Sequence, residues 1–215
     1  MKTIHTYIWD TALPYQDKRD DAGHAFITLE YAKQLVDLEG GNKDIVLPAI
    51  ILHDTGWSQL SREEWMVVFS PTATADDEMV VRLRHQEEGV KLARRILEEM
   101  DYPTAWTEEI LEIISEHDTR KDFISNDEGL MRDADKLWRF SKTGFDADIE
   151  RFKIDPQELH DRIIKQIPQE GFFYSETARE LALEELERRR REFTTAAAMQ
   201  TNIANQSPNS IQKCA

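Results

Sequence analysis

Apolar residues recur at three- or four-residue spacing along most of this chain, and the alternating runs that would predict strands are scarce. A first core helix is predicted to end at Gly40-Gly41 and to bury one face, formed by Ile27, Tyr31, Leu35 and Leu38. A second helix should run from about residue 42 to His53-Asp54. Because residues 45–52 are almost wholly apolar, we expect this helix at the centre of a bundle.

The same spacing predicts further helices. A long helix is expected from about residue 76 to 100, with one apolar face formed by Val80, Leu83, Val90, Ala93 and Leu97. The next helix carries an apolar stripe that His117 continues, so His117 should point inward; the stripe consists of Trp106, Ile110 and Ile113. Asp135 lies in a helix defined by Leu130, Ala134, Leu137 and Trp138. The pattern therefore predicts an all-α fold.

The length of 215 residues suits a single domain with a real core. We expect one helical domain over residues 1–193, with its chemical core in about residues 20–142 and peripheral helices in about residues 155–193. Thr, Ala, Asn, Gln and Ser dominate residues 194–215, which are expected to form a disordered tail.

The formal net charge of −15 argues against general binding to nucleic acid, because such a surface repels phosphate backbones. A small anionic substrate stays possible, since a metal ion can reverse the local potential. No apolar run is long enough to cross a membrane. Cys214 is the single cysteine, so an intrachain disulfide is excluded and a cytoplasmic location is expected. The sequence leaves the oligomeric state open.

Histidine and aspartate residues stand at or near the ends of several predicted helices. They are His24, His53, Asp54, His85, His117 and Asp135. A helical bundle can bring such residues to one point, and imidazole nitrogen and carboxylate oxygen suit divalent first-row metals. Water bound to such an ion becomes a nucleophile near neutral pH, and two neighbouring ions can clamp a phosphoryl group. The sequence therefore predicts a pocket for one or two metal ions.

This arrangement resembles the HD superfamily of metal-dependent phosphohydrolases. The resemblance covers about residues 20–142 and rests on a lone histidine, a His-Asp pair one helix later and a final Ala-Asp-x-Leu, which appear as His24, His53-Asp54 and Ala134-Asp135-Lys136-Leu137. It implies that His24, His53, Asp54 and Asp135 bind one ion, with Asp54 bridging to a second ion on His85 and His117. Mn, Fe, Mg, Ni, Co and Zn are all compatible with these ligands.

The resemblance implies hydrolysis of a small phosphorylated metabolite, a nucleotide being one candidate, by a metal-bound hydroxide. Asp54 would then serve catalysis as well as metal binding. Lys136 and Arg120 are the leading candidates to steady the phosphate, and nearby basic residues are Arg84, Lys121 and Arg139. The cyclic-dinucleotide signature Gly-Tyr-Pro is absent, and Trp57 stands where one nucleotidase branch has glutamate, so neither substrate class carries over.

Alternatives remain at the level of function and of single residues. The same fold and ligands serve di-iron oxygenases, among them the inositol oxygenases, and a non-catalytic regulatory module would also keep the fold. His85 has charged neighbours typical of a surface histidine, and Asp133 competes with Asp135, although it is expected to face solvent or support a neighbour. Asp20, four residues before His24, is a further candidate ligand.

Overall fold

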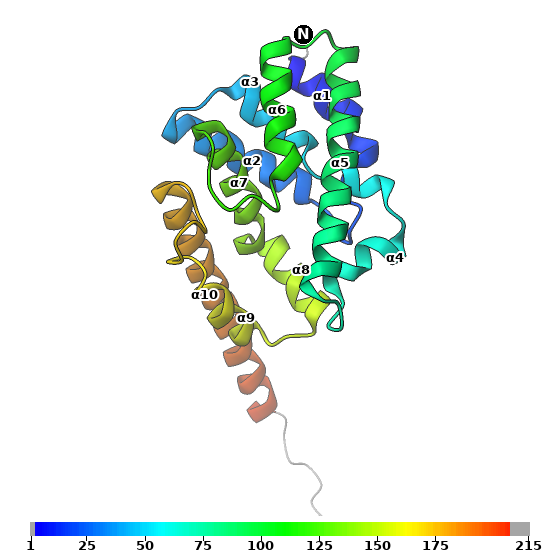
Figure 1. Cartoon of the computed structure of the whole chain (residues 1–215). Coiled ribbons are helices and arrows are strands. Elements are labelled where there is room, and N and C mark those ends of the chain that lie inside the picture. Colours follow the sequence, from blue (N-terminus) through cyan, green and yellow to red (C-terminus); the bar gives the residue numbers. More distant parts are fainter. Residues whose placement is uncertain (1–2, 207–215) are drawn as a thin grey trace, which may run out of the picture.

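The computed structural model describes residues 3–206, with side chains through residue 195, and this part of the chain contains helices but no strand (Figure 1). The α-helices are α1 (Ile4–Ala12), α2 (His24–Glu39), α3 (Lys43–Leu52), α4 (Arg62–Trp65), α5 (Ala75–Glu99), α6 (Thr104–Glu116), α7 (Asn126–Leu137), α8 (Lys142–Phe152), α9 (Pro156–Ile163) and α10 (Glu176–Gln206). Short 3-10 helices are η1 (Leu13–Tyr15), η2 (Thr55–Gln59), η3 (Met66–Phe69) and η4 (Trp138–Phe140). The predicted all-α fold is confirmed.

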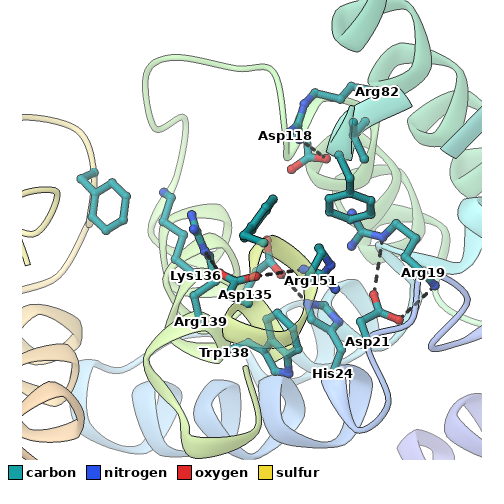
Figure 2. Close-up of a pocket in the computed structure, with 15 residues that line it drawn as sticks. Arg19, Asp21, His24, Arg82, Asp118, Asp135, Lys136, Trp138, Arg139 and Arg151 are labelled. Carbon is teal, nitrogen blue, oxygen red and sulfur yellow. Dashed lines mark hydrogen bonds and ion pairs between the residues drawn. The ribbon is translucent and has the colours of Figure 1, made fainter. Parts of the chain in front are cut away.

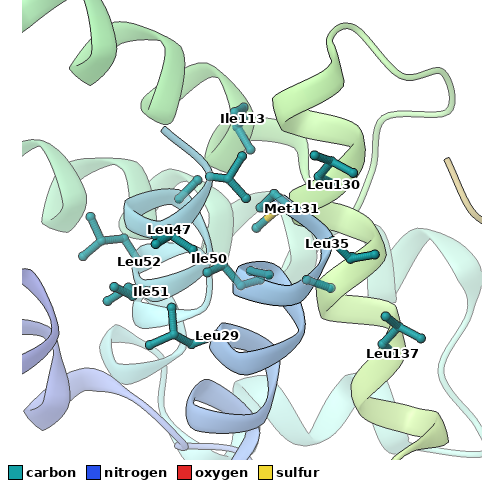
Figure 3. Close-up of a cluster of buried hydrophobic side chains, with 14 of the residues drawn as sticks. Leu29, Leu35, Leu47, Ile50, Ile51, Leu52, Ile113, Leu130, Met131 and Leu137 are labelled. Atoms are coloured by element: carbon teal, nitrogen blue, oxygen red, sulfur yellow. The ribbon is translucent and has the colours of Figure 1, made fainter. Parts of the chain in front are cut away.

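Helix α3 is the centre of the bundle, as predicted. Residues 45–52 are all buried, and α3 packs against α1, α2, α6 and α7 (Figure 3). The Asn42 side chain caps its start by accepting a hydrogen bond from the Asp44 amide. Pro48 lies in the second turn and cannot donate to the Asp44 carbonyl, which instead accepts a 2.7 Å hydrogen bond from the Tyr102 hydroxyl. This bond explains why the helix tolerates an internal proline.

Two predicted helix faces are wrong in part. In α2 the buried face is formed by Ala25, Leu29, Ala32, Leu35 and Val36, whereas Leu38 is 62% exposed. Because α2 contacts α3, α7 and α10, its buried face differs from the predicted stripe by a rotation about the helix axis. In α5 the side chains of Val80 and Leu83 are exposed, and Val81, His85 and Gln86 occupy the buried positions. The first half of α5 packs against η2, where polar side chains replace apolar ones.

Several boundaries also differ from expectation. The apolar pattern did not predict α1 or α8, which are short and carry mixed polar and apolar residues. Helix α10 continues past the expected end at residue 193 to Gln206, because alanine and glutamine after residue 195 have high helix propensity. Residues 194–206, expected as part of a disordered tail, are thus helical in the structure, and residues 207–215 lie outside the described part. Within that part, no helix is long and apolar enough to span a membrane.

Candidate metal centre

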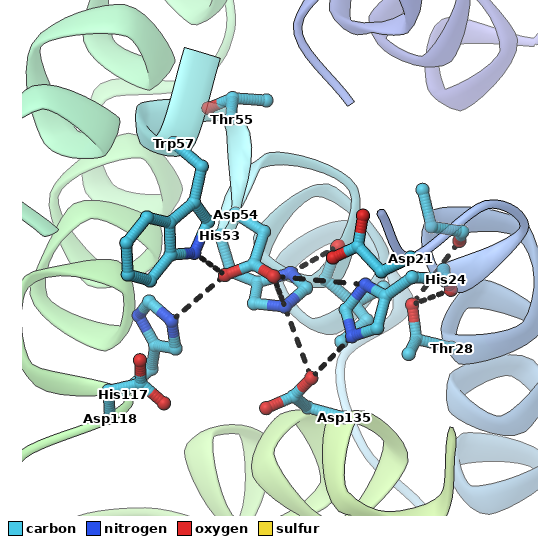
Figure 4. Close-up of polar contacts among 12 residues, drawn as sticks. Asp21, His24, Thr28, His53, Asp54, Thr55, Trp57, His117, Asp118 and Asp135 are labelled. Atoms are coloured by element: carbon cyan, nitrogen blue, oxygen red, sulfur yellow. Dashed lines mark hydrogen bonds and ion pairs between the residues drawn. The ribbon is translucent and has the colours of Figure 1, made fainter. Parts of the chain in front are cut away.

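The six predicted ligands lie in five helices or directly after them and converge at the middle of the bundle. Figure 4 shows five of them, all except His85. They are His24 at the start of α2, His53 and Asp54 directly after α3, His85 in α5, His117 directly after α6, and Asp135 in α7. The four histidines are buried, with exposed fractions of 5% or less. His85 therefore does not lie on the surface, despite its charged neighbours in sequence.

Local structure fixes where α2 begins and so where His24 lies. Gly23 has φ of +87°, a left-handed conformation that glycine adopts without strain. The carboxylate of Asp17 accepts hydrogen bonds from the amides of Gly23 and Ala25, at 2.8 and 3.0 Å. These contacts cap the helix on both sides of His24, and they hold its imidazole at the inner end of α2.

Asp54 lies between two sets of imidazoles. Its Oδ2 is 3.6 Å from His53 Nε2 and 3.8 Å from His24 Nδ1. Its Oδ1 is 3.5 Å from His85 Nε2 and 3.6 Å from His117 Nε2. Each oxygen thus faces its own pair of histidines, which is the geometry of a carboxylate able to bridge two ions. Asp135 completes the first set, with Oδ1 3.0 Å from His24 Nε2 and 3.3 Å from His53 Nε2.

Three imidazoles are oriented by their own helices. The Nδ1 atoms of His53, His85 and His117 each lie 2.8 Å from the carbonyl oxygen three residues earlier. Nδ1 therefore donates to the carbonyl, which leaves Nε2 as the atom that faces Asp54 and could bind a metal ion. This is the second interaction that metal-binding histidines commonly make, and it fixes both the tautomer and the ring orientation.

The donor atoms fit a divalent cation. Nε2 of His85 and Nε2 of His117 are fully buried and have no hydrogen-bond partner within the described residues. A buried polar atom without a partner is costly, and a cation at this point would satisfy both nitrogens. Donor atoms within 4.8 Å of one another occur in the groups His24-His53-Asp135 and His53-Asp54-His117. The residues present thus suit a metal on either side of Asp54.

Charges in the centre favour ionised carboxylates. Burial alone would raise the pKa of Asp54, but Arg19 and His53 outweigh burial and hold this pKa well below its usual range. The pKa of Asp135 is lowered well below its usual range in the same way, by His53 and His24 acting against burial. Both carboxylates are therefore in the form that binds cations.

Sequence reasoning missed three residues of the centre. Arg19 Nη2 lies 2.6 Å from Asp54 Oδ2, and the guanidinium stacks 4.3 Å above the ring of Trp57. Asp118, directly after His117, joins His85 and His117 in a further potential ligand group. Asp21 joins His24 and Asp54 in another. Proximity in sequence was the available signal for both aspartates, since Asp118 directly follows His117 and Asp21 lies three residues before His24, whereas nothing in the local pattern pointed to Arg19.

Two other aspartates lie outside the centre. Asp20 is not near His24, because its side chain is exposed and 3.8 Å from Arg62. Asp133 is fully buried rather than solvent-facing, but it does support a neighbour. Its carboxylate accepts hydrogen bonds from the amides of Tyr174 and Ser175 and from the Ser175 hydroxyl, at 2.7–2.8 Å. Asp133 therefore joins α7 to the start of α10.

A cavity of about 360 Å³ opens beside the centre (Figure 2). His24, Asp135, Asp21 and Asp118 lie at its inner end. Its basic lining residues are Arg19, Arg82, Lys136, Arg139 and Arg151, and its apolar ones are Val68, Phe69, Trp138, Phe152 and Phe172. Lys136 Nζ is buried and has no hydrogen-bond partner in the described part of the chain. The cavity is thus suited to an anion with an apolar portion.

Arg120, predicted to hold phosphate, does not line this cavity. Its guanidinium pairs with Glu112 at 2.6 Å and Glu116 at 2.8 Å, both on α6. The turn after His117 directs it toward the outside of that helix, so proximity in sequence to a ligand was misleading. Arg84 likewise pairs with Glu64 on the surface.

Comparison with known families agrees with this geometry. The family model of the HD domain matches residues 21–139, more than half of the chain, and includes all six converging residues. The chain belongs to the HD-domain family. HD domains bind divalent metal ions, and the His/Asp groups of this HD domain are suited to hold them.

Among solved structures, the chain is similar to the crystal structure of a predicted HD superfamily hydrolase from an uncultured Thermotogales bacterium. The TM-score is 0.53 at 19% identity, and the match covers 94% of this chain and 90% of the other. At this identity the likeness concerns the fold. No curated protein matches the chain.

Proposed function

We propose that this HD domain is a metal-dependent phosphohydrolase that acts on a small phosphate ester, with a nucleotide as one candidate. The observation that carries the proposal is the position of Asp54 between two pairs of histidines, next to a cavity with a basic lining. This combination suits phosphoryl transfer, because its catalysis consists mainly of positioning and of balancing negative charge.

The residues divide between two cation positions. His24, His53, Asp54 and Asp135 would hold one ion, and His85 and His117 would hold a second ion that shares Asp54. Asp118 would add a carboxylate to the second position. A bound divalent cation lowers the pKa of water and stabilises charge on a phosphate. The ligand types are compatible with Mn, Fe, Mg, Ni, Co or Zn.

Lys136 is the protein group best placed to contact the phosphate. It follows Asp135 directly, lines the cavity and leaves Nζ without a partner among the described residues. Burial, followed by repulsion from Arg132, lowers the pKa of Lys136. A phosphate oxygen near Nζ would oppose both effects and favour the ammonium form. Arg19 acts differently, because its contact with Asp54 holds that carboxylate in place.

The test is phosphate release from a panel of nucleotides and sugar phosphates, with each candidate metal supplied in turn. We expect hydrolysis by the wild-type protein and a loss of at least about a thousandfold in Asp54→Ala. His5→Ala should retain full activity, since His5 lies outside the centre and pairs with Asp44. Absence of phosphate release with every metal, together with substrate-dependent oxygen uptake by the iron form, would identify a di-iron oxygenase instead.

A further inference from the structure

One wall of the cavity carries cations that the metal centre does not use. Arg139 in η4 and Arg151 in α8 both line the cavity, and both contact Asp148 in α8. Arg139 Nε lies 3.1 Å from Asp148 Oδ2, and Arg151 Nη1 lies 2.9 Å from Asp148 Oδ1. Asp148 is 3% exposed, so a single buried carboxylate holds two guanidinium groups side by side.

Further contacts restrain Arg151. Its guanidinium lies 4.3 Å above the ring of Phe69, and Nη2 donates to the Asp20 carbonyl at 3.3 Å. Arg139 is less restrained, because it uses Nε alone for Asp148, and its terminal nitrogens have no other partner within residues 3–206. Arg139 therefore offers free donors at the cavity, while Asp148 fixes its position and Arg151 in turn holds Asp148.

Charge on this wall is unbalanced. Lys136, Arg139 and Arg151 contribute three positive charges, against the one negative charge of Asp148. The remaining carboxylates of the cavity belong to the metal centre or its immediate neighbours. Arg139 and Arg151 share the Asp148 carboxylate and repel each other, and an anion bound beside Arg139 would offset part of that repulsion.

The order of these groups along the chain indicates where each lies relative to the metal centre. Asp135 contacts the histidines of the centre, Lys136 follows it, and Arg139 comes three residues later, where α7 passes into η4. Side chains three residues apart lie on the same face of a helix. A substrate that reaches from the centre past Lys136 therefore meets Arg139 next.

We propose that Arg139, held by Asp148, binds a second phosphoryl group of the substrate. This inference rests on the proposed phosphohydrolase function and narrows it to substrates with two phosphoryl groups, either joined, as in a nucleoside diphosphate, or separate, as in a sugar bisphosphate. The reaction remains hydrolysis: the oxygen of water bonds to phosphorus, the P–O bond to the rest of the substrate breaks, and the leaving oxygen takes up a proton.

The test compares matched substrates in the full-length, metal-loaded protein. The pairs are AMP with ADP and fructose 6-phosphate with fructose 1,6-bisphosphate, and a preference within one pair distinguishes joined from separate groups. We expect kcat/KM for one of the doubly phosphorylated compounds to exceed that of its partner by about tenfold or more. Arg139→Gln should raise KM about tenfold for that compound alone, with kcat nearly unchanged, and Arg139→Lys should restore part of the loss.

Lys142→Gln is the matched control, because Lys142 is an exposed cation on α8 that pairs with Asp146 and does not line the cavity. It should leave both constants unchanged. Equal catalytic efficiency within both pairs, or an Arg139→Gln loss that is the same for singly and doubly phosphorylated compounds, would overturn the inference. If Arg139→Gln fails to fold, equal catalytic efficiency of the wild-type protein within both substrate pairs would still overturn the inference.

A binding measurement separates this inference from the proposed function. At a fixed free metal concentration, calorimetry should show that inorganic pyrophosphate binds about tenfold tighter than inorganic phosphate, and that Arg139→Gln abolishes the difference. Tighter pyrophosphate binding that depends on Arg139, without phosphate release from any substrate, would refute the proposed hydrolase function and support the second phosphoryl subsite. Hydrolysis of monophosphates, together with equal binding of pyrophosphate and phosphate, would refute the subsite and leave the proposed hydrolase function standing.

Discussion

Asp54 is the residue that would link two metal positions, because its oxygens face different histidines. The first pair, His24 and His53, is supported by Asp135, whereas the second pair has Asp118 as an additional carboxylate. The two positions should therefore differ in how much metal they retain when their ligands are removed.

We expect His85→Ala and His117→Ala each to lower metal content by about one equivalent per chain while the first position stays filled. The physical reason is that each removes one of two imidazoles from the second position and leaves His24, His53 and Asp135 intact. Elemental analysis of the purified variants measures this, with His5→Ala as the control. Unchanged metal content in both variants would show that the centre is mononuclear.

Residue by residue, the sequence predicted which histidines and aspartates converge at the centre better than it predicted the groups around them. The His-Asp pair was recognisable because it directly follows an almost wholly apolar helix, and the lone histidine and Ala134-Asp135 because they stand in the matching order around it. Arg19 and Arg151 could not be predicted, since each reaches the cavity from a helix or loop whose position depends on tertiary packing. Arg120 shows the converse, because a neighbour of a ligand can point away from it.

At the scale of elements, the centre depends on close contact between η2 and α5. Gly56 in η2 has no room for a side chain, because a Cβ at this position would lie 1.9 Å from the His85 carbonyl oxygen and 2.5 Å from the Gly89 amide nitrogen. Both contacts are with backbone, which cannot rotate away. The distance between these elements therefore sets the position of His85 relative to Asp54.

Gly56→Ala should force α5 away from η2 and lower the free energy of unfolding by about 3 kcal/mol, near the upper end of overpacking effects. Displacing His85 should also empty the second metal position. Urea unfolding and elemental analysis check the two effects together. Gly171→Ala is the control, since no atom lies within 4 Å of its Cβ position, and we expect a cost of about 1 kcal/mol from its positive φ. Wild-type stability in Gly56→Ala would contradict this account of the packing.

Element positions were predictable where the hydrophobic period was strong, as in α3, α6 and α7. The buried face was less predictable where the two halves of one helix pack against different surroundings. The first half of α5 buries His85 and Gln86 against η2, so the apolar stripe of its second half could not be extended backward. The same holds for α2, which is covered by several helices rather than by one.

For the whole molecule, metal binding and folding should be linked, because the ligands are distant in sequence and meet only in the folded chain. Removing metal with a chelator should therefore lower the thermal midpoint by about 5–10 °C, an effect expected when free metal exceeds its Kd about a hundredfold. Differential scanning calorimetry with and without chelator measures this. Asp54→Ala should show no chelator-dependent shift, and an unchanged wild-type midpoint would mean that the folded chain holds no metal.

The central claim is that His24, His53, Asp54 and Asp135 surround one cation, and metal content tests it most directly. Elemental analysis of wild-type protein after incubation with each candidate metal, followed by gel filtration, should give one to two equivalents per chain, as expected for a mononuclear or dinuclear site. His53→Ala, treated identically, should lose the ion of the first position, about one equivalent per chain. A metal content that is the same in His53→Ala and the wild-type protein would contradict the account.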